Sequence, residues 1–251
     1  MVGRLLPLLA GLLLGGMASA HDHHAVSDAP KVDYAKVWLE KQQTAPRLAV
    51  AATFDATGRL WLARVVGQQI FVSQSADAGR SFAEAVAVNR EPELISADGE
   101  ARPQIAAIGQ RIYVSWTQAL PQPFAGHIRL AVSDDGGKTF GEPLTVNDDT
   151  RPITHRFNAM LADTRGVTLA WIDKRDGAGN PDYTGAAIYT ARSTDGGRSF
   201  ETNRKLADHS CECCRIALAV DTDGTPVALW RQVFGQSTRD FALARLAPGL
   251  G

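Results

Sequence analysis

The chain has 251 residues, and its 26 Lys and Arg against 27 Asp and Glu leave a formal net charge of −1. This balance gives no reason to expect nucleic acid or an anionic membrane surface as a partner, because both attract strongly basic surfaces. Without a long charged or low-complexity tract, the length allows one large all-β domain.

The first twenty residues predict a secretory signal peptide. Arg4 gives a positive start, an apolar run follows over residues 5–14, and Ala18-Ser19-Ala20 forms a small-residue cleavage site. The apolar run is too short for a membrane-spanning helix. We therefore expect residues 1–20 to be removed, and the protein to be periplasmic or secreted without a membrane span.

Residues 21–46 predict a His-rich N-terminal arm. After cleavage, His21 would carry the free α-amine and His23 would be the third residue. An amine, two amide nitrogens and an imidazole can hold Cu(II) or Ni(II) in a square plane. The alternative is a disordered polar leader that holds some metal incidentally. Within the same arm, Val37-Trp38-Leu39 suggests a short strand that packs on the first or last sheet of the following domain.

From residue 47 onward, the sequence repeats two apolar segments joined by a turn. Each unit begins with an Arg and closes its second segment with a Trp, at separations of 14 or 15 residues. The four pairs are Arg47 with Trp61, Arg102 with Trp116, Arg156 with Trp171, and Arg215 with Trp230. Because the Trp residues recur at a fixed register, we predict that they pack between neighbouring units.

Three of the units also contain an octapeptide with the pattern Ser-x-Asp-x-Gly-x-Ser/Thr-Phe. Its copies begin at Ser75, Ser133 and Ser193, at spacings of 58 and 60 residues. The Asp can accept backbone N–H groups across a tight turn, and the Gly can adopt a positive φ. We predict that each copy is the turn between the third and fourth strands of a four-stranded antiparallel sheet.

The octapeptide resembles the Asp-box of bacterial sialidases and other Asp-box (BNR-repeat) β-propellers. This resemblance implies an all-β, sialidase-like β-propeller of four-stranded antiparallel blades over residues 47–251. We expect blades at residues 47–101, 102–155, 156–214 and 215–251, the last without its fourth strand. Because that family usually has six blades, about four blades predict an incomplete six-bladed ring with apolar blade faces exposed.

Strand topology divides the loops between two faces. In an antiparallel meander, the octapeptide turns lie on one face. The long loops between second and third strands lie on the other face, together with the connections between blades. Loops on a rigid scaffold commonly carry functional residues. We therefore expect the functional site on the face away from the octapeptides.

The segment His209-Ser210-Cys211-Glu212-Cys213-Cys214 belongs to a connection on that face. Thiolates with an imidazole suit Cu(I) or Zn(II), and His209 or His155 would complete the set of ligands. The alternative is a disulfide, such as Cys211 with Cys214, that leaves one thiol over. The segment also resembles one in exported bacterial Asp-box proteins. The sequence names no cofactor with certainty, and Cu or Zn is the metal that these residues suit.

The resemblance also implies a glycosidase activity. Sialidases of this fold hold the substrate carboxylate with three arginines, and they use a Tyr nucleophile supported by a Glu, together with an Asp acid/base. The candidate carboxylate-binding residues here are Arg47, Arg102, Arg156, Arg215 and Arg175. The candidate nucleophile is Tyr183 and the candidate acid–base residues are Asp173 and Asp176, with no Glu assignable to Tyr183.

The structural alternative is that each Arg forms a repeated ion pair at a blade start and that residues 173–176 form a solvated loop. The Phe/Tyr-Arg-Ile-Pro motif of the sialidases is absent from the sequence. We therefore expect an exported propeller that binds a ligand or handles Cu or Zn. Its partner would be a small acidic ligand, a sugar or a metal ion. The alternatives are an exo-α-sialidase acting on sialic-acid-like sugars, and an interaction scaffold of the cell envelope.

Overall fold

The structure is a computed structural model that describes residues 32–44, 49–98, 100–180, 182–183 and 185–246. The chain divides into two compact units, residues 1–32 and residues 33–251. The predicted signal peptide, the predicted metal ligands His21 and His23, and Arg47 lie outside the described residues.

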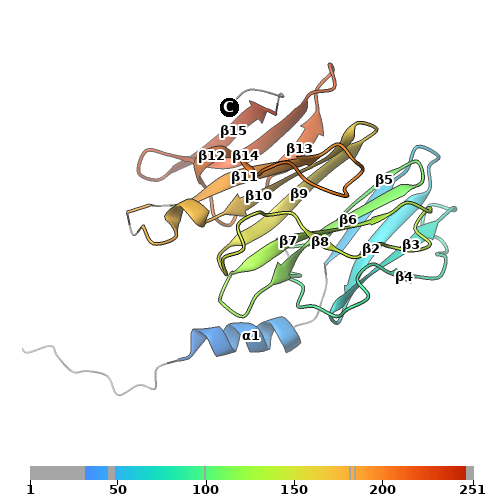
Figure 1. Cartoon of the computed structure of the whole chain (residues 1–251), viewed down its shortest axis with the longest axis horizontal. Helices are drawn as coiled ribbons and strands as arrows, with labels where there is room; N and C mark the ends of the chain where they lie inside the picture. The colour runs from blue at the N-terminus through green and yellow to red at the C-terminus, as the bar shows by residue number, and fades with distance from the viewer. Residues whose placement is uncertain (1–31, 45–48, 99, 181, 184, 247–251) are drawn as a thin grey trace, which may run out of the picture. The chain divides into compact units, whose positions relative to one another are not determined.

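The second unit contains three antiparallel sheets in the described residues, and the largest of them divides into two meanders (Figure 1). We call the resulting four groups of strands blades 1 to 4. Blade 1 contains β1 (Val50–Phe54), β2 (Leu60–Val66), β3 (Gln69–Ser75) and β4 (Val86–Ala87). Blade 2 contains β5 (Gln104–Ile108), β6 (Arg111–Ala119), β7 (Gly126–Ser133) and β8 (Leu144–Thr145). Blade 3 contains β9 (His155–Asp163), β10 (Gly166–Asp173), β11 (Ala186–Ser193) and β12 (Arg204–Ser210). Blade 4 contains β13 (Ala217–Val220), β14 (Pro226–Phe234) and β15 (Thr238–Arg245).

These sheets confirm the predicted fold, a β-propeller of four-stranded meanders whose last described blade has three strands. Blades 3 and 4 also share one pair of strand residues, Ser210 on β12 and Gln232 on β14. The three Arg-to-Trp intervals that the structure describes contain strands and turns and no helix.

The octapeptides form the turns between the third and fourth strands of blades 1 to 3, as predicted. Asp77, Asp135 and Asp195 each accept a bond from the backbone N–H of the Ser or Thr four residues later, at 2.9–3.0 Å. Each carboxylate also accepts a bond from the hydroxyl of that residue at 2.6 Å. The conserved Gly of each copy has a φ between +79° and +89°, which glycine adopts without a steric penalty.

Apolar cores between successive blades hold the propeller together. Trp61 and Trp116 belong to the core between blades 1 and 2, Trp171 to the next core, and Trp230 to the third. Each of these side chains is at most 6% exposed, which confirms the prediction that they pack between units. Replacing such a buried Trp by Ala typically costs about 3–5 kcal/mol.

Residues 37–39 are helical, so the predicted strand there is wrong. They belong to α1 (Tyr34–Thr44), whose composition is rich in helix-forming Ala, Leu, Lys, Glu and Gln. Asp33 caps the helix by accepting a bond from the backbone N–H of Lys36 at 3.1 Å. The short apolar run resembled a strand because three residues cannot separate a period of 2 from one of 3.6.

Large apolar side chains are exposed on the first and last blades. Phe54 on β1 is 61% exposed, and Phe241 and Leu243 on β15 are 69% and 64% exposed. Ala242 and Ala244 alternate with these two residues and pack into the core toward blade 3. Phe241 and Leu243 therefore occupy strand positions on the opposite face of blade 4, away from blade 3.

Candidate functional site

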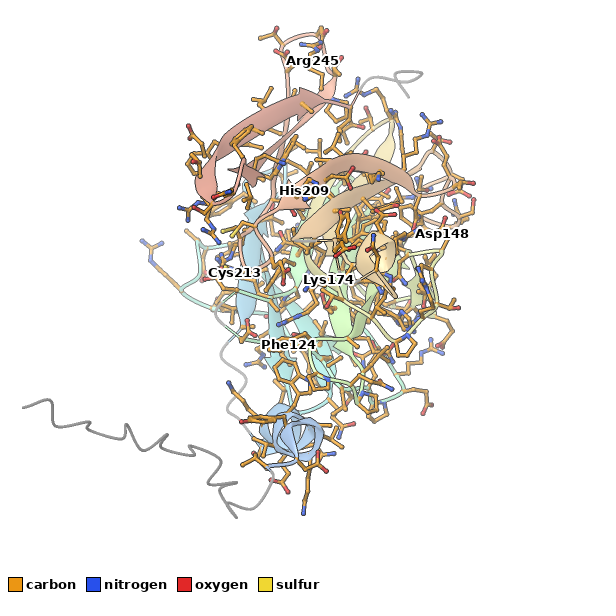
Figure 2. The ribbon with its side chains drawn as sticks, turned by 90° about the vertical axis from the view of Figure 1, so that its left-hand side faces the viewer. Phe124, Asp148, Lys174, His209, Cys213 and Arg245 are labelled. Atoms are coloured by element: carbon orange, nitrogen blue, oxygen red, sulfur yellow. The ribbon has the colours of Figure 1, made fainter. Side chains whose placement is uncertain are left out.

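A pocket of about 800 Å³ lies on the face that the loop topology predicts. Long loops contribute Phe124, Lys174 and Tyr183, the connections between blades contribute Asp98 and Cys213, and α1 contributes Trp38. Figure 2 shows Phe124, Lys174 and Cys213 on the same side of the domain. The pocket therefore combines the β6–β7 and β10–β11 loops with the segments that link one blade to the next.

Arg156, the second residue of β9, is the buried cation of this pocket and only 5% exposed. Its guanidinium carbon lies 4.7 Å from the ring centre of Phe157, and 5.5 and 5.6 Å from those of Phe124 and Trp38. One terminal nitrogen lies 3.2 Å from a carboxylate oxygen of Asp98. Burial lowers the pKa of Arg156, although the Asp98 carboxylate opposes that shift. The Nε atom of Arg156 is buried and has no hydrogen-bond partner among the described residues.

Three of the four described non-glycine residues with a positive φ belong to segments of this face, and the fourth, Ala78, lies in an octapeptide turn. Phe124, Phe157 and His209 have φ values of 63°, 57° and 54°, a region that side chains with a Cβ rarely adopt. Such a conformation costs about 1–3 kcal/mol per residue and is often found at binding sites. Two of the three aromatic rings around Arg156 are therefore held in place by strained backbone.

Tyr183 lines the pocket, and its hydroxyl donates to Asp208 at 2.8 Å. Its ring stacks on the imidazole of His209 at 5.4 Å between centres. Burial and the Asp208 carboxylate raise the pKa of Tyr183. Among the described residues, the carboxylate that pairs with this phenol is thus an Asp at the end of β12, and not a Glu.

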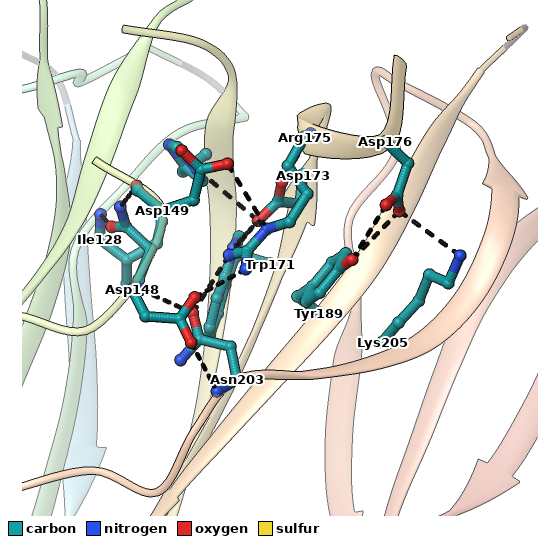
Figure 3. Close-up of polar contacts among 12 residues, drawn as sticks. Ile128, Asp148, Asp149, Trp171, Asp173, Arg175, Asp176, Tyr189, Asn203 and Lys205 are labelled. Atoms are coloured by element: carbon teal, nitrogen blue, oxygen red, sulfur yellow. Dashed lines mark hydrogen bonds and ion pairs between the residues drawn. The ribbon is translucent and has the colours of Figure 1, made fainter. Parts of the chain in front are cut away.

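Asp173 and Arg175 lie outside the pocket lining, in a polar network between blades 2 and 3 (Figure 3). The fully buried Asp173 accepts bonds from the indole of Trp171 at 2.8 Å and from Arg175 at 2.9 and 3.1 Å. Arg175 also donates to Asp148 at 2.6 Å, and its guanidinium lies 4.0 Å from the ring centre of Tyr189. Every polar group of this pair thus has a structural partner.

Asp176 belongs to an adjoining part of that network. It accepts bonds from the Tyr189 hydroxyl at 3.1 and 3.2 Å, and Lys205 Nζ lies 3.6 Å away. Burial and the Asp176 carboxylate raise the pKa of Tyr189 to about 12. Asp176 therefore lies beside a phenol and an ammonium group and is not among the pocket-lining residues.

Two further candidate arginines, Arg102 and Arg215, line a second cavity of about 470 Å³ between the inner strands. Arg102 and Arg215 each precede their strand by two residues, and both belong to this lining. Arg215 Nε donates to Glu100 at 2.6 Å. Glu100 borders both cavities, so Arg156 lies next to this pair without sharing its pocket. The four described candidate arginines, Arg102, Arg156, Arg175 and Arg215, are thus divided among two cavities and the Arg175 network.

The three cysteines converge in the connection between β12 and β13. Their Sγ atoms all lie within 4.8 Å of one another, with 3.5 Å between Cys211 and Cys213. Cys214 Sγ donates to Cys211 Sγ at 2.7 Å. The Cys211 N–H donates to the Arg231 carbonyl at 2.9 Å, which ties this connection to β14.

The environments of these thiols differ. Burial would raise the pKa of Cys211, but hydrogen bonds from Cys214 and Cys213 outweigh it and lower that pKa. Burial, together with the bond that it donates to Cys211, raises the pKa of Cys214 to about 11. Cys211 is therefore the more acidic thiol of this pair.

The two candidate imidazole ligands lie elsewhere. His155 is fully buried at the start of β9, where Nδ1 donates to the Gly126 carbonyl at 2.8 Å and Nε2 lies 3.7 Å from Asp173. His209 stacks on Tyr183. Within the described part of the chain, the group that could hold a metal consists of the three cysteines without a His.

Sequence reasoning missed several pocket residues. The sequence predicts a strand at Trp38, which instead reaches the pocket from a helix. Asp208, the partner of the pocket residue Tyr183, has no sequence signal because isolated carboxylates are common on surfaces. Phe124 could have been identified as a site residue by one sequence feature, its position in a long loop of the predicted functional face. Phe157 follows Arg156 directly, but its positive φ is set by the folded chain and has no sequence signature.

No protein-family model matches the chain, and no curated protein matches it by sequence. Solved structures do resemble it in fold. The α-L-arabinofuranosidase of Fusarium graminearum in complex with an iminosugar inhibitor is 13% identical, with a TM-score of 0.57, over 78% of this chain and 62% of that one. A protein of unknown function from Dyadobacter fermentans is 16% identical, with a TM-score of 0.55, over 78% of this chain and 60% of that one.

The chain thus spans about 60% of the length of these structures. At such low sequence identities, the similarity shows a shared fold alone. Within the part of the chain that the structure describes, no helix has the length and apolar character needed to cross a bilayer. The strand order and these similarities together establish that the fold is a β-propeller of antiparallel blades.

Proposed function

We propose that the protein is an exported β-propeller that binds one Cu(I) or Zn(II) ion through Cys211, Cys213 and Cys214. The observation that carries this proposal is the convergence of three sulfurs within 4.8 Å of one another. Three soft thiolates suit Cu(I), and Zn(II) would need a fourth ligand such as water from the adjoining pocket. The exported location rests on the sequence of residues 1–20.

The position of the cluster supports this function. The connection is held at one end by β12 and at the other by β13, and the Cys211 amide is bonded to β14. Ligands fixed by sheet on both sides lose little conformational freedom when they bind an ion. Cys213 and Glu212 also line the large pocket, so an ion could reach the sulfurs from solvent.

The test is a Cu(I) titration of the reduced protein under anaerobic conditions, in competition with a chromophoric chelator. We expect one tightly bound Cu(I) in the parent and none at this site when all three cysteines are replaced by Ser. Glu212→Gln is the matched control, because it changes the same connection and keeps every thiol. Equal Cu(I) affinity of the parent and the triple variant would show that the proposal is wrong.

A second candidate function is the binding of a small acidic or sugar ligand in the large pocket. It is favoured by one observation, the buried Arg156 whose Nε lacks a partner among the described residues. The pocket volume of about 800 Å³ falls within the usual range for small-ligand sites. Calorimetric titration with sialic acid and arabinose, on the parent and on Arg156→Lys, tests this function. If the parent gives no heat of binding with either sugar, this candidate function is wrong.

A further inference from the structure

The three thiols differ in their access to solvent. Cys211 is 5% exposed, Cys214 is half-buried, and Cys213 is exposed and lines the large pocket. The sulfur of Cys211 lies 3.5 Å from that of Cys213 and 2.7 Å from that of Cys214. A reagent in solution therefore meets Cys213 first, and Cys211 contacts both other sulfurs.

We propose that these cysteines form a thiol–disulfide relay in which Cys213 reacts with a small external disulfide and Cys211 passes the oxidation on to Cys214. The end product is a Cys211–Cys214 disulfide with a free Cys213 thiol. The relay itself needs no metal. Its consequence for metal binding rests on the function proposed above.

The chemistry runs in three exchanges. The Cys213 thiolate attacks one sulfur of the external disulfide, whose S–S bond breaks, and a mixed disulfide forms as one small thiolate leaves. The Cys211 thiolate then attacks the Cys213 sulfur and expels the second small thiolate. Finally the Cys214 thiolate attacks the Cys211 sulfur and releases Cys213. Two protein thiols lose two electrons and two protons, and one external disulfide becomes two thiols.

The geometry explains this order. Cys213 and Cys214 are adjacent in sequence, and a disulfide between neighbours is strained. Cys211 and Cys214 are separated by two residues, the spacing of Cys-x-x-Cys redox pairs. The Cys214 N–H bonds to the Cys211 carbonyl at 3.3 Å, so a turn already holds these two residues together. The last exchange therefore places the disulfide between the two residues that this turn already holds together.

Oxidation would also control the proposed metal site. The Cys211–Cys214 bond removes two of the three thiolates, so an ion bound there must leave. External thiols would reverse the three steps from Cys213, which stays exposed to the pocket. The same connection would thus hold the ion under reducing conditions and release it under oxidising ones.

The experiment uses reduced, metal-free protein mixed with glutathione disulfide, then acid quenching, alkylation and peptide mass mapping. We expect the parent to gain a Cys211–Cys214 disulfide with an alkylated Cys213. Cys213→Ser should form that disulfide at about one tenth of the parental rate or below, because the solvent-accessible attacking thiol is lost. Cys211→Ser should trap one glutathionyl group on Cys213. Cys214→Ser should stop at a Cys211–Cys213 disulfide.

A Cys213→Ser protein that forms the Cys211–Cys214 disulfide at the parental rate would overturn the relay. Glutathione found on Cys214 in the Cys211→Ser protein would do the same. Circular dichroism of each variant confirms that its strand content is retained. Because these oxidations are measured without metal, they separate the relay from the proposed function. A reduced protein that fails to bind Cu(I) contradicts only the metal site, and normal Cu(I) binding with no relay contradicts only the relay.

Discussion

The hydroxyl of Tyr183 donates to the carboxylate of Asp208 at 2.8 Å, so the phenol in the large pocket is already paired. Burial and Asp208 both raise the pKa of Tyr183, which keeps the phenol protonated at neutral pH. Burial would raise the pKa of Asp208, but bonds from Tyr183 and Lys205 outweigh it and lower that pKa. Asp208 is consequently a weak base for activating this Tyr as a nucleophile.

We therefore expect the purified protein to release no fluorophore from a fluorogenic α-sialoside above the rate of the buffer. Tyr183→Phe should behave like the parent in this assay, while near-ultraviolet titration should show one phenolate fewer at very alkaline pH. Hydrolysis by the parent that disappears in Tyr183→Phe would instead establish the sialidase alternative.

The second prediction concerns the attachment of α1. The ring of Trp38 lies 4.6 Å from that of Phe124 and 5.6 Å from the Arg156 guanidinium. A cation–π contact of this kind contributes about 0.5–2 kcal/mol. Trp38→Ala should thus raise the population of detached helix roughly fivefold or more, since about 1 kcal/mol has that effect.

Limited trypsin digestion at Lys36 and Lys41 measures this attachment. Val37→Ala is the matched control, because Val37 belongs to the same helix and is 51% exposed. We expect faster cleavage in Trp38→Ala and parental cleavage in Val37→Ala. Similar rates in the two variants would mean that the ring contacts do not hold the helix.

The third prediction concerns acid stability. Hydrogen bonds from Ser81 and Ser75 lower the pKa of Asp77 from 3.8 to about 2, and similar bonds lower the pKa of Asp135 and Asp195. A carboxyl whose pKa is lower in the folded chain stabilises the fold fully above its unfolded pKa of about 4, and this stabilisation is lost as the pH falls toward 2.

Replacing the three carboxylates by Asn should therefore flatten the fall in stability between about pH 4 and pH 2. Urea unfolding followed by circular dichroism over that range provides the measurement. Asp240→Asn, on the exposed strand β15, serves as the control that keeps the octapeptides. An unchanged slope in the triple variant would show that these turns do not govern acid unfolding.

The fourth prediction concerns the N-terminal arm, which lies outside the described residues. If cleavage after Ala20 frees the amine of His21, then His23 completes a square-planar set of nitrogens for Cu(II). A Cu(II) ion bound in this way should give a visible absorption band. Acetylation of the α-amine should abolish the band, and so should His23→Ala. Replacement of the three cysteines should leave it unchanged. Cu(II) absorption that survives acetylation would contradict the proposed coordination.

Much of the fold could be predicted because its information is local and repeated. The octapeptides at Ser75, Ser133 and Ser193 encode their own hydrogen bonds, since the Asp and its Ser or Thr partner are four residues apart. The Trp register reports burial because it recurs in every unit. The strand predicted at residues 37–39 is wrong, because a single short apolar run has no repeat that would fix its period.

The candidate site was harder to predict because its contacts join distant segments. The cysteines could be grouped from the sequence, because they fall within four residues. The surroundings of Arg156 could not be predicted, since its rings come from α1, the β6–β7 loop and β9. His155 illustrates the same limit, because a carbonyl 29 residues earlier in the chain determines its orientation.

The single ladder pair between Ser210 and Gln232 has a consequence for how the domain opens. Among the described residues, this is the one ladder contact between blades 3 and 4, and blade 4 has three described strands with Phe241 and Leu243 exposed. In a chain of nearest-neighbour units, a unit with few contacts opens first. The amide protons of blade 4 should therefore exchange ahead of those in blade 3. The cysteine connection joins blade 3 to blade 4, so an ion bound there would link the two blades and slow the amide exchange of blade 4.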